Sequence, residues 1–278
     1  MAEESPFPDE EGALLDDLED ALIVGIITAY LNSIKVIKPS SFNSNNFTVI
    51  DELQDNLRKE LTTILPSLNN VSTKSIGVAV ERTKANISIG DFTFDYSDPR
   101  LAAHIQDVFD ANIQAVIDTN EKTINAIIND GRDNGLTDSQ IAKRIIKYWG
   151  LTPSHLQTVL NYERALLENG TKRSRVNELV SKRIDELIDW RVNLLATNIS
   201  NDIVEGSKNI AFEQMKTAGV LGDNIVKQWV AIVDSRTTTT CLGLHNKQAE
   251  VGQRFDGGYL YPPAHIGCRS SVILTKRK

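Results

Sequence analysis

Sulfur-containing and aromatic residues are scarce in this 278-residue sequence. It has two cysteines, two methionines and an aromatic content of 6%. The N-terminus is acidic and lacks the basic and then apolar opening of a signal peptide, so nothing in it indicates export. We therefore expect a reducing, cytosolic setting in which the two cysteines remain free rather than form a disulfide.

Long apolar runs and common enzyme motifs are missing as well. Between Asp20 and Lys35 lie fourteen uncharged residues, fewer than the roughly 20 needed to cross a bilayer, so this stretch predicts a buried helix and no membrane span. The sequence has no GxxxxGK[ST] phosphate loop, no GxGxxG, no HExxH and no GxSxG. We therefore expect a protein without enzymatic activity.

Basic residues are absent from the first twenty positions, which hold nine acids. The other 258 residues carry 28 acids and 30 bases, so the net charge of −7 belongs to the N-terminal tip. With Pro6, Pro8 and Gly12 among these acids, residues 1–12 are predicted to form an extended lead-in. It is either a solvated, poorly ordered end or an arm that docks on a basic partner.

What the sequence does contain is helical periodicity and good helix ends. Apolar residues recur at helical spacing, as in Leu53, Leu57 and Leu61, while Thr137 with Gln140 has the form of a capping box. We expect an N-terminal helical region over 13–135 and a second over 136–222. Their predicted helices lie at about 13–37, 49–66, from 73 onward, 99–119, 120–133, 138–149, 153–169 and 174–217.

One stretch within the first region alternates in the manner of a β-hairpin. In residues 87–96, apolar and polar side chains alternate on both sides of Gly90-Asp91, a pair suited to a two-residue turn. Ile89 would then face Phe92. Because an isolated hairpin is barely stable, we expect these side chains to pack on neighbouring helices rather than stack nucleic-acid bases.

The second helical region invites a comparison with DNA-binding proteins. Its helices at 138–149 and 153–169 are joined by a short turn, as in a helix-turn-helix, but the later helix has no dense basic face. Lys172, Arg173 and Arg175 form the most basic local cluster. A mixed-charge helix surface is usually only solvated, so contact of this cluster with a DNA backbone is a hypothesis.

After Gly222 the pattern changes to that of a small α+β module over 223–278. Residues 226–233 are rich in β-branched side chains and are predicted to form a strand, with 271–275 as its partner. The fold class predicted from the whole chain is mainly α: a helical body with one β-hairpin and a small α+β C-terminal module.

Both cysteines and two of the four histidines fall within this module. Cys241 and His245 are separated by three residues, and His265 and Cys268 by two, with nineteen residues between the pairs. Two close pairs joined by a loop suit a tetrahedral metal, and Zn²⁺ is the first expectation. The alternative is that the cysteines are small buried residues and the histidines polar surface groups.

The same stretch resembles the terminal domain of the phage Mu F-like head-morphogenesis family, the minor head proteins of tailed bacteriophages. The resemblance is strongest over about 190–275 and is carried by Lys227-x-Trp229, by Asp234-Ser235-Arg236-Thr237, by Cys241 and by Pro262-Pro263-Ala264-His265-Ile266-Gly267-Cys268-Arg269. Many relatives have further cysteines where this sequence has Leu244 and Ser270, so His245 would have to replace a ligand.

The resemblance implies a minor capsid protein of the virion, present in the procapsid and made in the host cytoplasm. It would act in head morphogenesis at or near the portal and in DNA packaging or ejection. Its partners would be the portal protein, capsid or scaffolding proteins, and genomic DNA. Trp229, Asp234, Arg236, Pro262, Pro263 and Arg269 would have structural roles. Two alternatives remain: a metal-dependent nuclease that uses the Cys/His module, or a helix-turn-helix DNA-binding protein.

Overall fold

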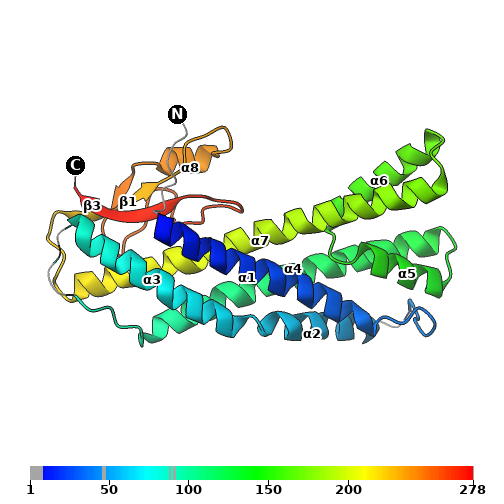
Figure 1. The fold of residues 1–278 in the computed structure, drawn as a ribbon, viewed down its shortest axis with the longest axis horizontal. Helices are drawn as coiled ribbons and strands as arrows, with labels where there is room; N and C mark the ends of the chain where they lie inside the picture. Colours follow the sequence, from blue (N-terminus) through cyan, green and yellow to red (C-terminus); the bar gives the residue numbers. More distant parts are fainter. Residues whose placement is uncertain (1–8, 46–47, 88, 90–91, 278) are drawn as a thin grey trace. The chain divides into compact units, whose positions relative to one another are not determined.

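The structure is a computed structural model that describes residues 9–45, 48–87, 89 and 92–277. It is mainly helical with one small antiparallel sheet, as the sequence predicts (Figure 1). The helices are α1 (Asp9–Ser33), α2 (Thr48–Thr62), α3 (Leu65–Ile87), α4 (Pro99–Asp133), α5 (Asp138–Tyr148), α6 (Pro153–Glu168), α7 (Arg173–Thr217) and α8 (Thr239–Leu244), with the 3-10 helix η1 (Ile34–Val36) after α1. The strands are β1 (Ile225–Val230), β2 (Gln248–Ala249) and β3 (Ser271–Lys276).

The predicted signals set both ends of α6 and the start of α5. At α5, the Thr137 hydroxyl accepts from the Gln140 amide while the Gln140 side chain accepts from the Thr137 amide, which confirms the capping box. At α6, Thr152 caps the amide of His155, and Gly170 follows the helix with a φ of 74°. A side chain would strain that backbone, so glycine suits the end of the helix.

Two of the predicted helix boundaries are wrong. Residues 99–133 form one helix rather than two. Asn120 and Thr123, beside the predicted boundary, are buried within it, and Thr123 donates its hydroxyl to the carbonyl of Leu151 at 2.9 Å. The next helix after α2 begins at Leu65 rather than after Ser72. Pro66 lies in its first turn, where the missing N–H costs no helical hydrogen bond.

The ends of the N-terminal segments also differ from the prediction. Residues 9–12 belong to α1 rather than to an extended lead-in, and residues 1–8 lie outside the described part. The predicted hairpin is wrong at its described positions: Ile87 ends α3, and 92–95 form no strand. Gly90 and Asp91 lie outside the described residues. The Gln214 side chain bonds both the N–H and the C=O of Asp95, so this backbone is satisfied without a strand partner.

The sheet has the order β2-β1-β3, with both pairings antiparallel. The predicted pairing of the module's two long strands is confirmed, with Ile225 opposite Lys276 and Val230 opposite Ser271. β1 ends three residues before the predicted position 233. There the amide of Ala231 donates to the His245 side chain instead of continuing the ladder.

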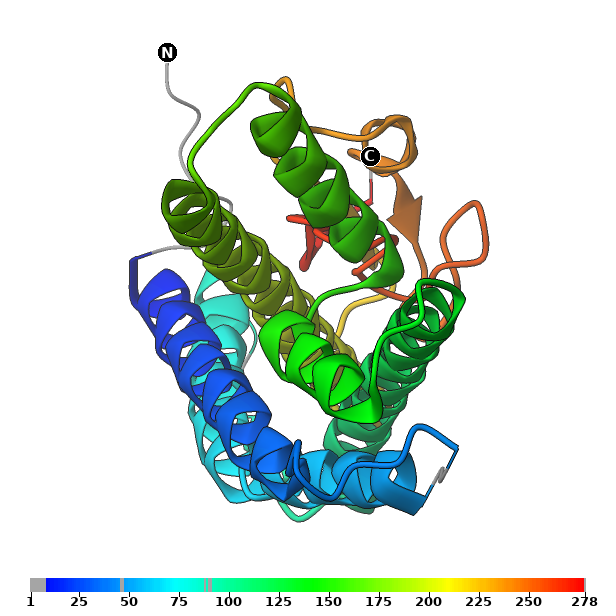
Figure 2. The ribbon, with the colours of Figure 1, turned by 90° about the vertical axis from the view of Figure 1, so that its right-hand side faces the viewer.

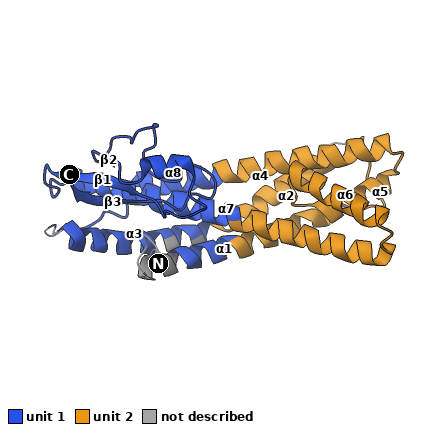
Figure 3. Ribbon diagram, turned by 90° about the horizontal axis from the view of Figure 1, so that it is seen from above, with its two compact units in different colours: residues 1–22, 65–110, 194–278 blue, residues 23–64, 111–193 orange. Residues whose placement is uncertain are grey.

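The chain divides into two compact units (Figure 3). Unit 1 comprises residues 1–22, 65–110 and 194–278, and unit 2 comprises 23–64 and 111–193. Neither is a continuous stretch, because α1, α4 and α7 each contribute to both.

In unit 1 the sheet is covered by helices from earlier in the chain. α3 contacts β3 there, and the buried apolar residues of α3, α7, β1 and β3 include Ile76, Val80, Phe212, Met215, Val226, Trp229, Val272 and Leu274. In unit 2 the helices surround a core that includes Leu53, Leu57, Ile127, Ile128, Ile141, Ile145, Val159 and Val180. Figure 2 shows that α6 and the start of α7 form a helical hairpin.

Candidate metal centre

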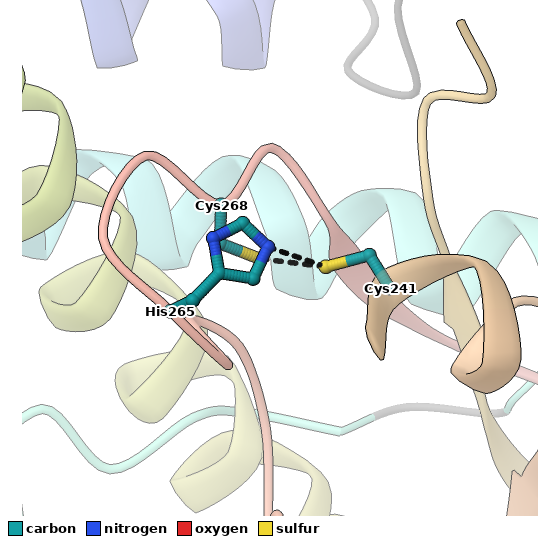
Figure 4. Close-up of side chains that lie close together, drawn as sticks. All are labelled: Cys241, His265 and Cys268. Atoms are coloured by element: carbon teal, nitrogen blue, oxygen red, sulfur yellow. Dashed lines mark hydrogen bonds between the residues drawn. The ribbon is translucent and has the colours of Figure 1, made fainter. Parts of the chain in front are cut away.

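Three chemistry-bearing side chains of the C-terminal module meet beside α8 (Figure 4). Cys241 lies in α8, while His265 and Cys268 come from the loop that leads into β3. α8 begins at a local signal, because the Thr238 hydroxyl accepts from the Cys241 amide. The helix therefore fixes one ligand, and the loop brings two more against it.

The ligand atoms lie close enough to hold a metal ion. The Cys241 sulfur is 3.0 Å from Nε2 of His265 and 3.5 Å from the Cys268 sulfur, and all three atoms lie within 4.8 Å of one another. A tetrahedral zinc ion with bonds of about 2.0 to 2.3 Å separates its ligand atoms by roughly 3.3 to 3.8 Å. The two sulfurs are already at such a separation, so only small shifts are needed.

The position of the proton on the His265 ring leaves Nε2, the nitrogen that faces the sulfurs, free to bind a metal. Its Nδ1 lies 2.9 Å from the carbonyl oxygen of Ile266. Since only an N–H donates to a carbonyl, Nδ1 carries the proton of the neutral ring. Nε2 then presents its lone pair to Cys241 and to the Thr238 hydroxyl, which is 2.8 Å away. A backbone carbonyl behind the ring is a common way to orient a metal-binding histidine.

Cys268 is held from behind by α7. Its carbonyl accepts from the Asn201 side chain at 2.8 Å, and its sulfur is buried. Burial raises the pKa of the Cys268 thiol, which favours the protonated form when no cation is nearby. An ion that binds here must therefore displace a proton, so its affinity falls as the pH falls.

His245, the fourth predicted ligand, is not part of this group. Its Nδ1 accepts from the amide of Ala231 at 3.1 Å, and the residue lies just beyond the end of α8 with extended backbone. The spacing from Cys241 would place both side chains on one face of a longer helix. α8 stops at Leu244, so the chain turns before this face is completed.

Two residues of the family resemblance fasten the ligand-bearing segments together. Arg269, which follows Cys268, donates two hydrogen bonds to Asp234 at 2.9 and 2.6 Å. Arg269 holds the pKa of the Asp234 carboxyl well below its usual range. Arg236 also contacts this carboxylate, through its backbone amide at 2.9 Å and through Nε at 3.6 Å. The loop before α8 is thereby tied to the loop before β3.

Trp229 and the two prolines lie elsewhere in the module. Trp229 is fully buried in β1 and packs edge-on against Phe255, with 5.4 Å between the ring centres. The bond between Pro262 and Pro263 is cis, in the loop before His265. Trp229 therefore belongs to the core of the module, and the two prolines shape the loop that leads to His265.

Sequence reasoning missed the polar network that attaches β3 to α7. Glu205 and Lys208 are buried and ion-paired at 2.8 Å, and both bond the Ser271 hydroxyl. Glu205 also accepts from the amide of Val272 at 2.8 Å. With Asn201 these side chains lie on one helical face at i, i+4 and i+7, a spacing that could have revealed a polar stripe. No local pattern indicated its partner strand.

The predicted DNA contact residues lie at the start of α7 in unit 2. Arg173 pairs with Glu163 at 3.2 Å, and Arg175 pairs with Glu178, while Lys172 is exposed. Two of the three charges are thus already balanced by glutamates. α5 and α6 are joined by residues 149–152, and the later helix carries Glu163, whose side chain is largely covered and pairs with Arg173. These contacts lower the positive potential that a DNA backbone would meet.

Within the described residues, no helix combines the length and apolarity needed to span a membrane. No protein-family model, no curated protein and no solved structure matches this chain.

Proposed function

We propose that this protein is a minor head protein of a tailed bacteriophage. It would act in head morphogenesis at or near the portal and in genome packaging or ejection. The proposal rests on the resemblance of the C-terminal sequence to the Mu F-like family. The observation that supports it best is that Asp234 and Arg269, which lie apart in the resembling motif, are ion-paired beside Cys241, His265 and Cys268.

We further propose that the three ligands bind Zn²⁺. Two thiolates and one imidazole are soft to borderline donors, which suit zinc better than the oxygen-seeking Mg²⁺ or Ca²⁺. The ion would join α8 to the loop before β3. A small module gains stability from such a link, because the chain has no preformed site when it is unfolded. On this proposal the module is a structural clip and not an enzyme.

The partners proposed for the protein are the portal protein and the capsid or scaffolding proteins, with genomic DNA as a further contact. The test is to follow the full-length chain through purification of procapsids and mature particles from infected cells. We expect it at low copy in procapsids, together with the portal protein. Its absence from both kinds of particle would overturn the assignment.

Metal content tests the zinc proposal separately. The chain purified without chelator should carry about one zinc per molecule by elemental analysis. His265→Ala should lose it and His245→Ala should retain it, because only the first imidazole lies in the group of ligands. Equal zinc in both variants, or none in the unaltered chain, would contradict this ligand set.

A metal-dependent nuclease is the second candidate, and one observation favours it. Three protein ligands with an open fourth position are typical of catalytic rather than structural zinc sites. A plasmid-nicking assay with zinc, magnesium or manganese distinguishes the two functions. Cleavage that disappears in Cys268→Ser would favour the nuclease over the structural clip.

A further inference from the structure

The candidate ligands open onto a surface pocket. Cys241 and His265 line it together with Thr238, Arg236 and Arg269, while Cys268 lies buried behind them. His265 and the largely buried Cys241 therefore border this pocket, and Cys268 lies on its inner side. If an ion occupies the group, one side of its coordination sphere faces this pocket.

Counting ligands shows what the pocket leaves open. Among the described residues, three ligand atoms converge, and tetrahedral zinc takes four. The Thr238 hydroxyl lies 2.8 Å from Nε2 of His265, so it borders the remaining position. It also caps α8 and carries a proton, which makes it a better hydrogen-bond donor to a bound group than a ligand in its own right.

The charge around the opening selects the kind of ligand. A divalent ion with two thiolates and a neutral imidazole has no net charge. At the rim, Arg236 and Arg269 face one carboxylate, that of Asp234, so one positive charge is left over. Arg269 is engaged by two hydrogen bonds with Asp234. Arg236 makes only one longer side-chain contact of 3.6 Å and is 75% exposed. Its guanidinium remains available to an anion.

We propose that this pocket binds an oxyanion, a carboxylate or phosphate oxygen, that completes the coordination of the metal. The oxygen takes the fourth position, Thr238 donates a hydrogen bond to it, and Arg236 balances its charge. The inference rests on the metal site proposed above. It gives that site a role in recognition, since a charged group from another molecule would become part of the clip.

Cobalt provides a spectroscopic test with the full-length chain. Co²⁺ replaces zinc in thiolate sites and gives a near-ultraviolet thiolate-to-cobalt absorption and visible bands that respond to the fourth ligand. Titration with inorganic phosphate and, separately, with acetate should shift the visible bands in a saturable way. Chloride is the control for a small anion that lacks oxygen atoms. The oxyanion that binds with the higher affinity shows whether the site prefers a phosphate or a carboxylate oxygen.

Two matched variants locate the binding. Arg236→Gln should weaken the binding of the oxyanion about three- to tenfold, because it removes one charge-assisted hydrogen bond. Arg254→Gln removes an arginine of the same module that bonds the carbonyl of Gly258 and does not line the pocket, so it should change nothing. Both variants should retain the thiolate-to-cobalt absorption.

The outcomes separate the two proposals. If the unaltered chain shows no thiolate-to-cobalt absorption when Co²⁺ is added, the metal site is wrong and this inference is wrong with it. If the thiolate-to-cobalt absorption is present but the visible bands do not shift with phosphate or acetate, only the oxyanion site is wrong. An equal response to chloride, or equal affinities in Arg236→Gln and Arg254→Gln, would also overturn the oxyanion site.

Discussion

The helical unit 2 and the C-terminal module, residues 223–278, are stabilised in different ways. In unit 2 the fully buried positions are mostly aliphatic, as with Leu53, Leu57 and Val180. In the module and the part of α7 that supports it, buried charges accompany the apolar core: Glu205, Lys208 and Lys227 are each less than 5% exposed. Unit 2 also holds a buried charge, Arg191, which donates to Asn120 and to the carbonyl of Gly150. Unit 2 therefore depends mostly on area removed from water, and the module depends to a larger extent on specific polar partners.

This difference has a consequence for tolerance to mutation. Aliphatic cores accept substitutions that preserve volume, because dispersion and burial have little direction. Buried ion pairs do not, since a charge that loses its partner keeps its desolvation cost. Single substitutions should therefore destabilise the module more than unit 2, although the module is the smaller of the two.

The largest effect should come from Glu205→Ala. The substitution takes from the buried Lys208 ammonium the carboxylate that it contacts at 2.8 Å and also removes the acceptor of the Val272 amide. Breaking a buried ion pair costs about 3 to 5 kcal/mol. Urea unfolding measures the loss, with Glu178→Ala as the control, because its pair with Arg175 is solvent-exposed and screened and should contribute little to stability. Similar losses would show that the buried network does not hold β3.

A core deletion in unit 2 should come next. Leu57→Ala empties a fully buried site in α2 and should lower the free energy of unfolding by about 2 to 5 kcal/mol. Leu167→Ala, at an exposed position of α6, should change it by less than about 0.5 kcal/mol. The same urea titrations measure both. If the two substitutions lower the free energy of unfolding equally, burial of aliphatic side chains is not what stabilises this unit.

Metal should affect the module by a smaller amount. At a free zinc concentration of about one hundred times the dissociation constant, binding stabilises the folded chain by about 2.7 kcal/mol. Thermal unfolding with zinc and with a chelator measures this increment. It should vanish in His265→Ala and persist in His245→Ala, whose side chain accepts from the Ala231 amide and lies outside the group of ligands. A chelator that leaves the melting temperature of the unaltered chain unchanged would contradict the clip.

The smallest effect concerns pH. Burial lowers the pKa of Lys227 from 10.5 to about 8, although its ammonium donates to the carbonyl of Leu260. Below pH 8 the lysine is charged in both states; between about 8 and 10.5 only the unfolded chain keeps its proton. Stability should therefore rise with pH over this window, by an amount on the order of 1 to 2 kcal/mol.

Lys227→Met isolates that contribution. The variant should lack the rise in urea-unfolding free energy between about pH 8 and pH 10, because it has no proton to lose there. Lys247→Met serves as the control, since Lys247 is half exposed and pairs with Asp256. A rise of equal size in the Lys227 variant would place its cause elsewhere in the chain.

Much of the helical architecture could be predicted from local chemistry. The capping box at Thr137, the Thr152 cap and the glycine at 170 set helix ends within a residue or two, because these signals act over three or four positions. The pairing of β1 with β3 was also predicted, from two β-branched stretches at the ends of one small module.

At several of the positions that were predicted wrongly, residues far away in the sequence supply the polar partners. Thr123 of α4 donates to the carbonyl of Leu151, and Gln214 bonds the backbone of Asp95 in place of a partner strand. At the metal centre, spacing alone selected His245, yet the amide of Ala231 engages it. Thr238 contacts His265 across 27 positions, a contact that no spacing rule predicts.

By itself the sequence determined which stretches are helices, where a β-containing module begins, and which residue types are available as soft ligands. Periodicity, helix caps and local composition act over a few residues, so they can be recognised from the sequence alone. Only the tertiary structure decided which three of the four Cys and His side chains of the module converge, and which buried charges hold β3 to α7. Those choices depend on directions in space between segments far apart in the chain, because most buried polar groups must find a partner wherever the fold places one.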